Sequence, residues 1–218
     1  MSPTSEVPAP PPSDPLRSPN FLTEAQRKAI HLAFILLPLE LLYQTLPWPR
    51  GKTEFRQLFL LLVVVAIALD LLRIHEHRFR EFIRQFFGQM LREHEQFNLL
   101  GSTYLLLAAL LAIEIFPQPV AAAALGFTVL GDAFAAIVGK GWGRTRIFGK
   151  SLEGFAGGLA ACLLWAVFLV WAVPLPWSVA LAGALVASAV EVLPIPLDDN
   201  LGITLFAGYT MKLLLPTS

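Results

Sequence analysis

Long apolar segments separated by short polar ones run through most of the chain. Seven can be recognised, at residues 29–46, 58–72, 99–116, 120–138, 155–173, 179–193 and 201–215. A helix that crosses the hydrocarbon core needs about 20 residues, and stretch 121–130 lacks the polar stripe of a soluble helix. We therefore predict an all-α polytopic membrane helix bundle with about seven transmembrane helices.

Three of these segments, at 58–72, 179–193 and 201–215, have only 15 residues each. Flanking residues are expected to extend segment 58–72. The two prolines that follow segment 179–193, Pro194 and Pro196, are expected to stop its helix. The last two segments could therefore be bent or only partly inserted.

Composition agrees with a membrane protein. The chain is 56% hydrophobic and only 15% charged, whereas soluble domains carry about 25% charged residues. The formal net charge is zero, so nothing indicates a nucleic-acid partner. The single cysteine, Cys162, lies in an apolar run, which excludes an internal disulfide and a cysteine-based zinc site.

The chain divides into a short tail and one large domain. Residues 1–22 are rich in proline, which is typical of a disordered tail, and residues 23–218 are expected to form a single membrane-embedded domain, catalytic if the motifs described below are those of an enzyme. Thr23 is the expected cap of the first helix. In the second loop, aromatic residues such as Phe79, Phe82 and Phe86 alternate with arginines, which predicts a helix lying in the membrane interface.

Lysine and arginine predict the orientation. Of the 16, 12 lie in the N-terminal region or in the loops after the second and fourth segments. Loops rich in these residues stay on the cytoplasmic side. We therefore expect a multi-pass protein of the cell (inner) membrane with a cytoplasmic N-terminus. The unusual polar residues fall in these same loops, so we expect the chemistry at the cytoplasmic face.

The stretch around the fourth loop is richest in candidate residues. Asp132 lies about two turns before the end of its helix, and an acid at that depth costs roughly 2.5 to 3.5 kcal/mol to insert. It is therefore either functional or paired with a cation of the loop. The glycines and basic residues that follow could cradle a phosphate or could be an ordinary cytoplasmic loop; they are Gly139, Gly141, Gly143, Arg144 and Arg146.

Two helix starts add further candidates. Ser151 suits an N-cap, and Lys150 before it could join the helix N-terminus in binding phosphate. Glu153 is either a first-turn acid that favours the helix dipole or a catalytic group. The run Asp198-Asp199-Asn200 opens the last segment. Its oxygens either cap that helix or bind Mg²⁺, which takes one or two carboxylates together with substrate phosphates.

These motifs resemble those of the family of polyprenol, dolichol, phytol and CTP-dependent diacylglycerol kinases. The resemblance covers about residues 24–215. It rests on Gly131-Asp132, the glycine-spaced basic loop, Phe148-Gly149-Lys150-Ser151-Leu152-Glu153-Gly154 and Asp198-Asp199-Asn200; Arg27-Lys28 with His31, and Asp70 with Arg73, are similar to the family's earlier motifs. It implies a membrane enzyme that transfers the γ-phosphate of CTP or another nucleoside triphosphate to a lipid alcohol.

The resemblance also implies roles for individual residues. Asp132, Asp198 and Asp199 would hold Mg²⁺ against the phosphates of CTP. Lys150, Arg144, Arg146, Ser151, Asn200 and the three loop glycines would bind the nucleotide. Glu153 or one of the aspartates would orient or deprotonate the alcohol, which could be a diacylglycerol, a polyprenol, a dolichol or phytol.

Two other functions stay open at this point. The central block also resembles phosphatidate cytidylyltransferases, but the later Lys-Asp, His-Gly-Gly and Asp-Arg-x-Asp motifs of those enzymes are absent from the sequence. A non-enzymatic transporter could also carry intramembrane acids, although the sequence shows no internal repeat.

Overall fold

The computed structural model describes residues 19–87, 95 and 97–215, and these form an all-helical fold with one small hairpin. The predicted tail up to residue 18 lies outside the described residues. In chain order the elements are α1 (Pro19–Ala33), α2 (Leu36–Tyr43), α3 (Gly51–His75), α4 (His77–Phe87), α5 (Gly101–Ile115), α6 (Gln118–Trp142), β1 (Arg146–Ile147), β2 (Lys150–Ser151), α7 (Leu152–Ala172), α8 (Trp177–Val192) and α9 (Asp199–Leu214).

The first predicted segment is two helices rather than one. Proline has no backbone N–H and its ring clashes with the carbonyl four residues earlier. Pro38 therefore cannot continue a helix that includes Phe34. The chain instead turns tightly, with Phe34 N donating to His31 O and Leu37 N donating to Phe34 O, both at 3.0 Å. The helix also begins at Pro19, so residues 19–22 are not part of a tail and Thr23 is not a cap.

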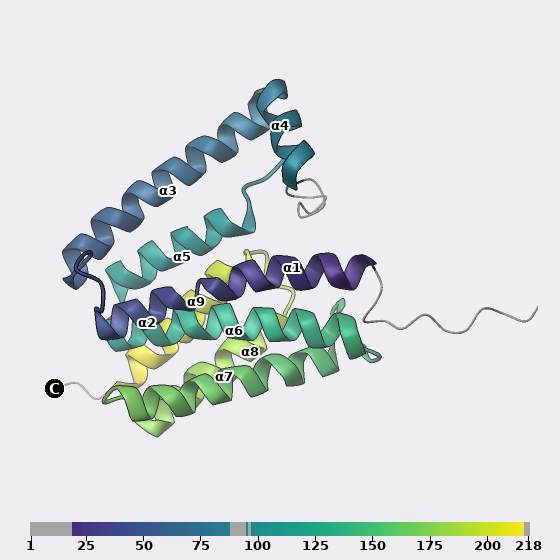
Figure 1. Ribbon diagram of the computed structural model, residues 1–218. Helices are drawn as coiled ribbons and strands as arrows, with labels where there is room; N and C mark the ends of the chain where they lie inside the picture. The colour runs from purple at the N-terminus through teal and green to yellow at the C-terminus, as the bar shows by residue number, and fades with distance from the viewer. Residues whose placement is uncertain (1–18, 88–94, 96, 216–218) are drawn as a thin grey trace, which may run out of the picture.

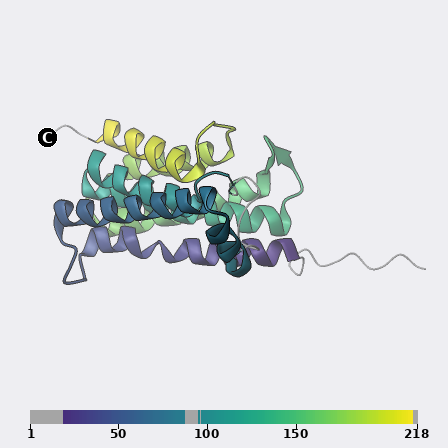
Figure 2. The same ribbon diagram turned by 90° about the horizontal axis from the view of Figure 1, so that it is seen from above.

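The helices run roughly along one direction, so that the connections gather at two ends (Figure 1). One end of the bundle holds the start of α1, the ends of α3 and α6, the β1–β2 hairpin and the start of α9. The α2–α3 and α5–α6 connections and the C-terminus lie at the opposite end, and the view from above agrees (Figures 1 and 2). The predicted site residues therefore share one end of the bundle.

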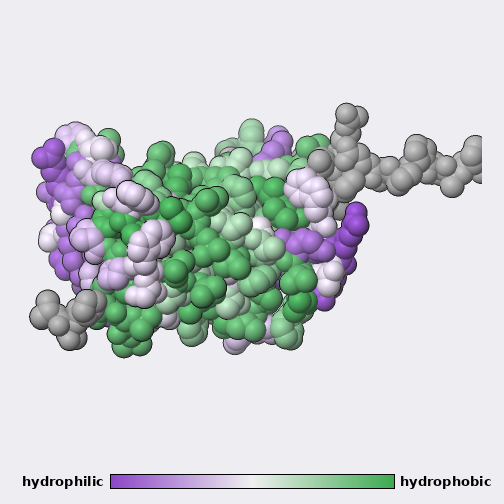
Figure 3. All heavy atoms as spheres, turned by 90° about the horizontal axis from the view of Figure 1, so that it is seen from below, coloured by the Kyte–Doolittle hydropathy of each residue, from purple (hydrophilic) through white to green (hydrophobic). Residues whose placement is uncertain are grey.

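A broad apolar band covers the face of the molecule seen in Figure 3, between two polar ends. Large apolar side chains are exposed on α3 and α7, where Leu61, Leu164 and Trp171 are 61%, 72% and 84% exposed. Extended apolar surface of this kind is rare on soluble monomers. α3, α6 and α7 are each long and apolar enough to cross a membrane, and α5 and α8 are shorter apolar helices. The described fold is compatible with a membrane protein.

α6 lies at the centre of the bundle. It packs against α1, α2, α5, α7, α8 and α9, and the side chain of Thr128 on α6 shares a hydrogen bond of 2.7 Å with Thr204 on α9. Glycines allow α7 to approach closely, since a Cβ on Gly154 would lie 2.7 Å from the carbonyl oxygen of Ala135. This position places Asp132 of α6 inside the molecule.

The helix predicted in the second loop is present as α4. Arg80 ties it to the end of α3 by donating to the carbonyl oxygens of Arg73, at 3.2 Å, and of Ile74. The rings of Phe82 and Phe86 pack in a tilted arrangement, 5.0 Å between centroids, and are 54% and 63% exposed. One face of α4 is therefore aromatic and uncovered, as expected for an interfacial helix.

Candidate functional site

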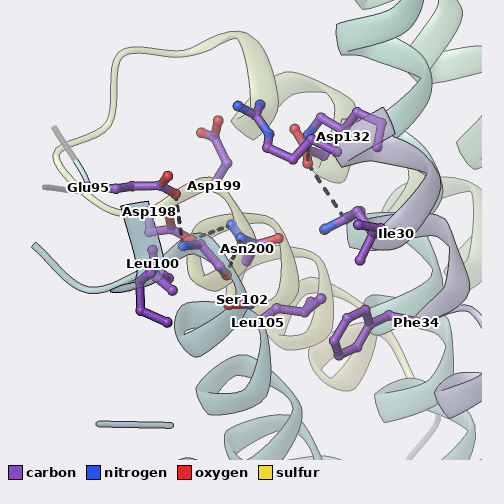
Figure 4. Close-up of a pocket in the computed structure, with 15 residues that line it drawn as sticks. Ile30, Phe34, Glu95, Leu100, Ser102, Leu105, Asp132, Asp198, Asp199 and Asn200 are labelled. Atoms are coloured by element: carbon purple, nitrogen blue, oxygen red, sulfur yellow. Dashed lines mark hydrogen bonds and ion pairs between the residues drawn. The ribbon is translucent and has the colours of Figure 1, made fainter. Parts of the chain in front are cut away.

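A cavity of about 410 Å³ opens between α1 and α5, and we call it the α1–α5 cavity. Ile30 of α1 and Phe34, the residue after α1, approach it from one side, and Leu105 faces them from α5 (Figure 4). Asp132, Asp198 and Asp199 line its other end. The cavity thus has apolar walls and an acidic end, which suits an amphiphilic molecule with a small polar head.

A second cavity of about 330 Å³ lies beside the β1–β2 hairpin, and we call it the hairpin cavity. Four basic residues line it, Arg27, Lys140, Arg146 and Lys150, together with Gly139 of α6, Gly149 of the hairpin and Gly154 of α7. Four acids line it as well: Glu24, Asp132, Glu191 and Asp199. The basic residues and the helix N-terminus favour an anionic ligand, and the acids favour a cation that accompanies it.

Three residues line both cavities: Arg27, Asp132 and Asp199. Arg27 comes from α1, Asp132 from α6 and Asp199 from the first turn of α9. A ligand in one cavity and a ligand in the other would meet at these side chains. The two cavities therefore adjoin one another at these three side chains.

Asp132 is held by residues of α1. The Lys28 ammonium donates to its Oδ2, and Nε2 of His31 lies 3.6 Å from the same oxygen. The Lys28 side chain is only 4% exposed and that of Asp132 only 13%. A buried pair of this kind is stable only while both charges are present. The pairing expected for Asp132 exists, but its partner is a helix residue and not a loop cation.

Lys150 makes a similar contact on the other side. Its ammonium lies 3.0 Å from Oδ2 of Asp199 and 3.1 Å from Oε1 of Glu191, and it donates to the carbonyl oxygen of Glu191. Partial burial acts to lower the pKa of this ammonium, but the two carboxylates outweigh that effect and raise the pKa. Lys150 is therefore firmly charged.

The hairpin that carries Lys150 depends on its turn residues. Phe148 and Gly149 both have positive φ, +50° and +85°, and two such residues form the tight turn that matches strand twist in a hairpin. Ile147 then pairs with Lys150, and Arg146 with Ser151. The Phe-Gly step places Lys150 at the cavity.

The three loop glycines have different positions. Gly139 lines the hairpin cavity, whereas Gly141 is buried in α6. A Cβ on Gly139 would lie 2.8 Å from Oγ of Ser151, and one on Gly143 would lie 2.7 Å from the same atom. Their main effect is to let the end of α6 pack against the start of α7, rather than to wrap a phosphate.

Ser151 caps α7, as the sequence predicts, by accepting a hydrogen bond of 3.0 Å from Gly154 N. Glu153 has a different role from the catalytic one considered for it. Its carboxylate accepts hydrogen bonds from the backbone N–H groups of Arg144, at 3.0 Å, and Thr145, at 3.2 Å. In the described structure Glu153 and Arg144 line neither cavity. Glu153 braces the loop before the hairpin.

Asp198 is the N-cap of α9, and its Oδ1 accepts a hydrogen bond of 2.9 Å from Asn200 N. Burial and the neighbouring charges of Asp199 and Asp132 raise the pKa of Asp198, against the hydrogen bonds from Asn200. Asn200 donates from Nδ2 to Gly101 O at 3.1 Å and lines the α1–α5 cavity. It therefore lies outside the hairpin cavity, although the sequence suggested that it binds the nucleotide.

Among residues 19–87, 95 and 97–215, no three His, Cys, Asp or Glu side chains form a group that could hold a metal ion alone. Asp132, Asp198 and Asp199 nevertheless line one cavity. Mg²⁺ is commonly bound by one or two carboxylates, with substrate phosphates and waters completing its shell. The donor set fits a cation that arrives with a phosphorylated ligand.

Asp70 and Arg73, similar to an earlier motif of the kinase family, brace the wall of the α1–α5 cavity. Arg73 donates to Asp70 Oδ1 at 3.0 Å and to the carbonyl oxygen of Glu95 at 2.6 Å. Asp70 Oδ2 accepts from Leu100 N at 2.8 Å and Thr103 Oγ1 at 2.7 Å. The pair, 2% and 3% exposed, thus joins α3 to the start of α5.

Sequence reasoning did not assign site roles to Lys28, His31 or Glu191. Lys28 and His31 are three residues apart and therefore share one helix face, and Glu191 is an acid inside an apolar segment. These signals show that the side chains are unusual. They do not show which distant residue each one meets.

Comparison with known proteins adds one relative. The chain is 25% identical over 199 residues to an uncharacterized protein of Rickettsia prowazekii (strain Madrid E), a match that covers 87% of this chain and 94% of the relative. No family model matches the chain. No solved structure matches it either.

Proposed function

We propose that the protein is a membrane lipid kinase that transfers the γ-phosphate of CTP, or of another nucleoside triphosphate, to a lipid alcohol. One observation supports this proposal most directly: a cavity lined by both basic and acidic side chains and a partly apolar cavity share a wall that contains Asp132 and Asp199. Phosphoryl transfer needs two substrates aligned across a charge-neutralising centre. The motif resemblance independently favours the same reaction.

The nucleotide phosphates would occupy the hairpin cavity. Lys150, Arg146 and Lys140 supply positive charge there. The N-terminus of α7 also favours an anion, through its backbone N–H groups and the helix dipole. Asp132 and Asp199 would hold Mg²⁺ at the junction. The bound cation would neutralise charge on the phosphate oxygens.

The lipid alcohol would occupy the α1–α5 cavity. Ile30, Phe34 and Leu105 would contact the first carbons of the chain, and the hydroxyl would lie at the acidic end. Asp198 lines this cavity but not the hairpin cavity, so its carboxylate would orient the hydroxyl. Its raised pKa makes it a better proton acceptor than an ordinary aspartate.

The proposed setting is the cell membrane, crossed seven times with the site on the cytoplasmic side. In this arrangement α1 and α2 together make one crossing, and α3, α5, α6, α7, α8 and α9 make the others. The predominance of Lys and Arg at the site end supports this orientation.

Purified protein in lipid nanodiscs tests the reaction directly. It would be given Mg²⁺ and CTP labelled at the γ- or the α-phosphate, with diacylglycerol, a polyprenol, phytol and phosphatidate as separate acceptors. We expect γ-label on an alcohol. Label from the α-position on phosphatidate, with release of pyrophosphate, would instead identify a cytidylyltransferase. No transfer from CTP or ATP would contradict both enzyme functions and favour a transporter.

A further inference from the structure

Each aspartate that forms the shared wall is already neutralised by a lysine. Lys28 pairs with Asp132, and Lys150 lies 3.0 Å from Asp199. The two lysines come from different elements, α1 and β2. A lysine ammonium therefore already contacts each of the two carboxylates that are proposed to bind Mg²⁺.

From this geometry we infer that Lys28 and Lys150 act as exchangeable counter-ions of the site. This inference rests on the proposed function. When a magnesium–nucleotide complex enters, each lysine moves from its aspartate to a phosphate oxygen, and each aspartate binds the metal. Every charge keeps a partner throughout, which a buried site requires.

The arrangement predicts that neither half of the complex binds well alone. A bare divalent cation meets an ammonium at each carboxylate and is repelled by it. A nucleotide without metal meets Asp132, Asp199 and Glu191 beside the basic residues. Only the complex supplies a positive partner for the acids and a negative partner for the lysines.

The two lysines differ in how easily they can move. The Lys28 side chain is 4% exposed, whereas that of Lys150 is 32% exposed and belongs to a two-residue strand. Lys150 and Asp199 line the hairpin cavity, whereas Lys28 lines the α1–α5 cavity. The Lys150 pair therefore exchanges first, and the Lys28 pair completes the site beside the lipid.

Manganese binding without nucleotide tests the exchange. Full-length protein in nanodiscs would be titrated with Mn²⁺, and free Mn²⁺ would be followed by electron paramagnetic resonance. We expect Lys28→Gln and Lys150→Gln each to bind bare Mn²⁺ about tenfold more tightly than the wild type, because a repelling charge is lost. Adding Asp132→Asn to Lys28→Gln should return the affinity to the wild-type value.

Lys212→Gln is the matched control. Lys212 lines neither cavity, its ammonium donates to Ile115 O at 3.0 Å, and the substitution removes the same charge. It should leave the affinity for bare Mn²⁺ unchanged. Lys150→Gln alters a half-exposed side chain and keeps the inference testable if Lys28→Gln does not fold.

Equal Mn²⁺ affinity in the wild type and both lysine variants would overturn the inference. A wild type that binds bare Mn²⁺ as tightly as Mn²⁺ with CTP would overturn it as well. Because the lysine comparison contains no nucleotide and no lipid, it is independent of the transfer assay. Failure of transfer with the expected Mn²⁺ pattern would reject the kinase but retain the exchange.

Discussion

Asp132 brings together parts of the chain that are far apart in sequence. Its partner Lys28 lies 104 residues earlier, and the other residues of the shared wall belong to α1 and α9. An apolar helix with one acid predicts that the acid matters. The apolar pattern does not show which cation neutralises the acid, because that depends on how α1 packs against α6.

Replacing this acid should stop the reaction while the protein stays folded, although with lower thermal stability, because Lys28 loses its buried carboxylate partner. Asp132→Asn keeps the size of the side chain but removes the negative charge that would bind the metal. The rate of phosphoryl transfer should therefore fall by at least about a hundredfold. Activity is measured by the labelled-CTP assay and folding by thermal unfolding in nanodiscs.

Glu114→Gln is the control for loss of one acidic charge, because Glu114 is exposed near the opposite end of α5. It should retain wild-type activity. Near-normal transfer by Asp132→Asn would show that the metal role of Asp132 is wrong.

Glu153 allows a second test at the residue scale. Its contacts with the backbone of Arg144 and Thr145 indicate a brace and not a base. Glu153→Gln should therefore keep transfer within a few-fold, since a glutamine oxygen still accepts a hydrogen bond. Glu153→Ala should lower the free energy of unfolding by about 1 kcal/mol. A hundredfold loss of kcat in Glu153→Gln, with normal thermal unfolding, would restore the catalytic role.

At the scale of elements, the start of α5 depends on α3. Asp70→Ala would leave Arg73 buried without its carboxylate and remove the acceptor for Leu100 N. Loss of one partner of a buried pair costs about 3 to 5 kcal/mol, so we expect a large drop in thermal stability. The exposed pair of Glu81 and Arg84, at 3.9 Å, provides the comparison. Glu81→Gln should change stability by less than about 1 kcal/mol, and equal effects would contradict the brace.

The size of the α1–α5 cavity should affect binding of the lipid alcohol but not binding of the nucleotide. Leu105→Trp replaces an aliphatic side chain with a bulky indole ring in the α1–α5 cavity, where Leu105 faces Phe34. We expect KM for the lipid alcohol to rise about tenfold, while CTP with Mg²⁺ still raises the thermal unfolding temperature as in the wild type. An unchanged lipid KM, or a parallel loss of the response to CTP, would show that the two cavities are not divided between the substrates.

Helices were more predictable from the sequence than contacts were. Segments 120–138 and 155–173 end within a few residues of α6 and α7, because apolar length and the glycines and prolines that flank it are local signals. The break between α1 and α2, at Phe34 and Ile35, was missed because the apolar pattern continues through it. Asp132, Asp199 and Lys150 do meet at one site, but the partner of each depends on tertiary packing that a periodic pattern does not encode.

For the whole molecule, the basic residues at the end opposite the site have a structural explanation. Lys52 donates to Glu114 O at 2.6 Å and Lys212 donates to Ile115 O at 3.0 Å. Both satisfy carbonyl groups at the end of α5, where a helix favours positive charge. These lysines therefore do not argue against placing that end outside the cell.

The proposed orientation predicts which end reacts with reagents outside the cell. Thr145 is exposed beside the hairpin and Ser178 is exposed near the start of α8, at opposite ends of the bundle. In a chain carrying Cys162→Ala, we expect a membrane-impermeant maleimide to label Ser178→Cys in intact cells and Thr145→Cys only after permeabilisation. Because the cysteines lie at the two ends of α7, equal labelling before permeabilisation would contradict a crossing by that helix. The reverse pattern would place the site outside, where cellular CTP could not reach it, and would therefore contradict the proposed kinase as well as the orientation.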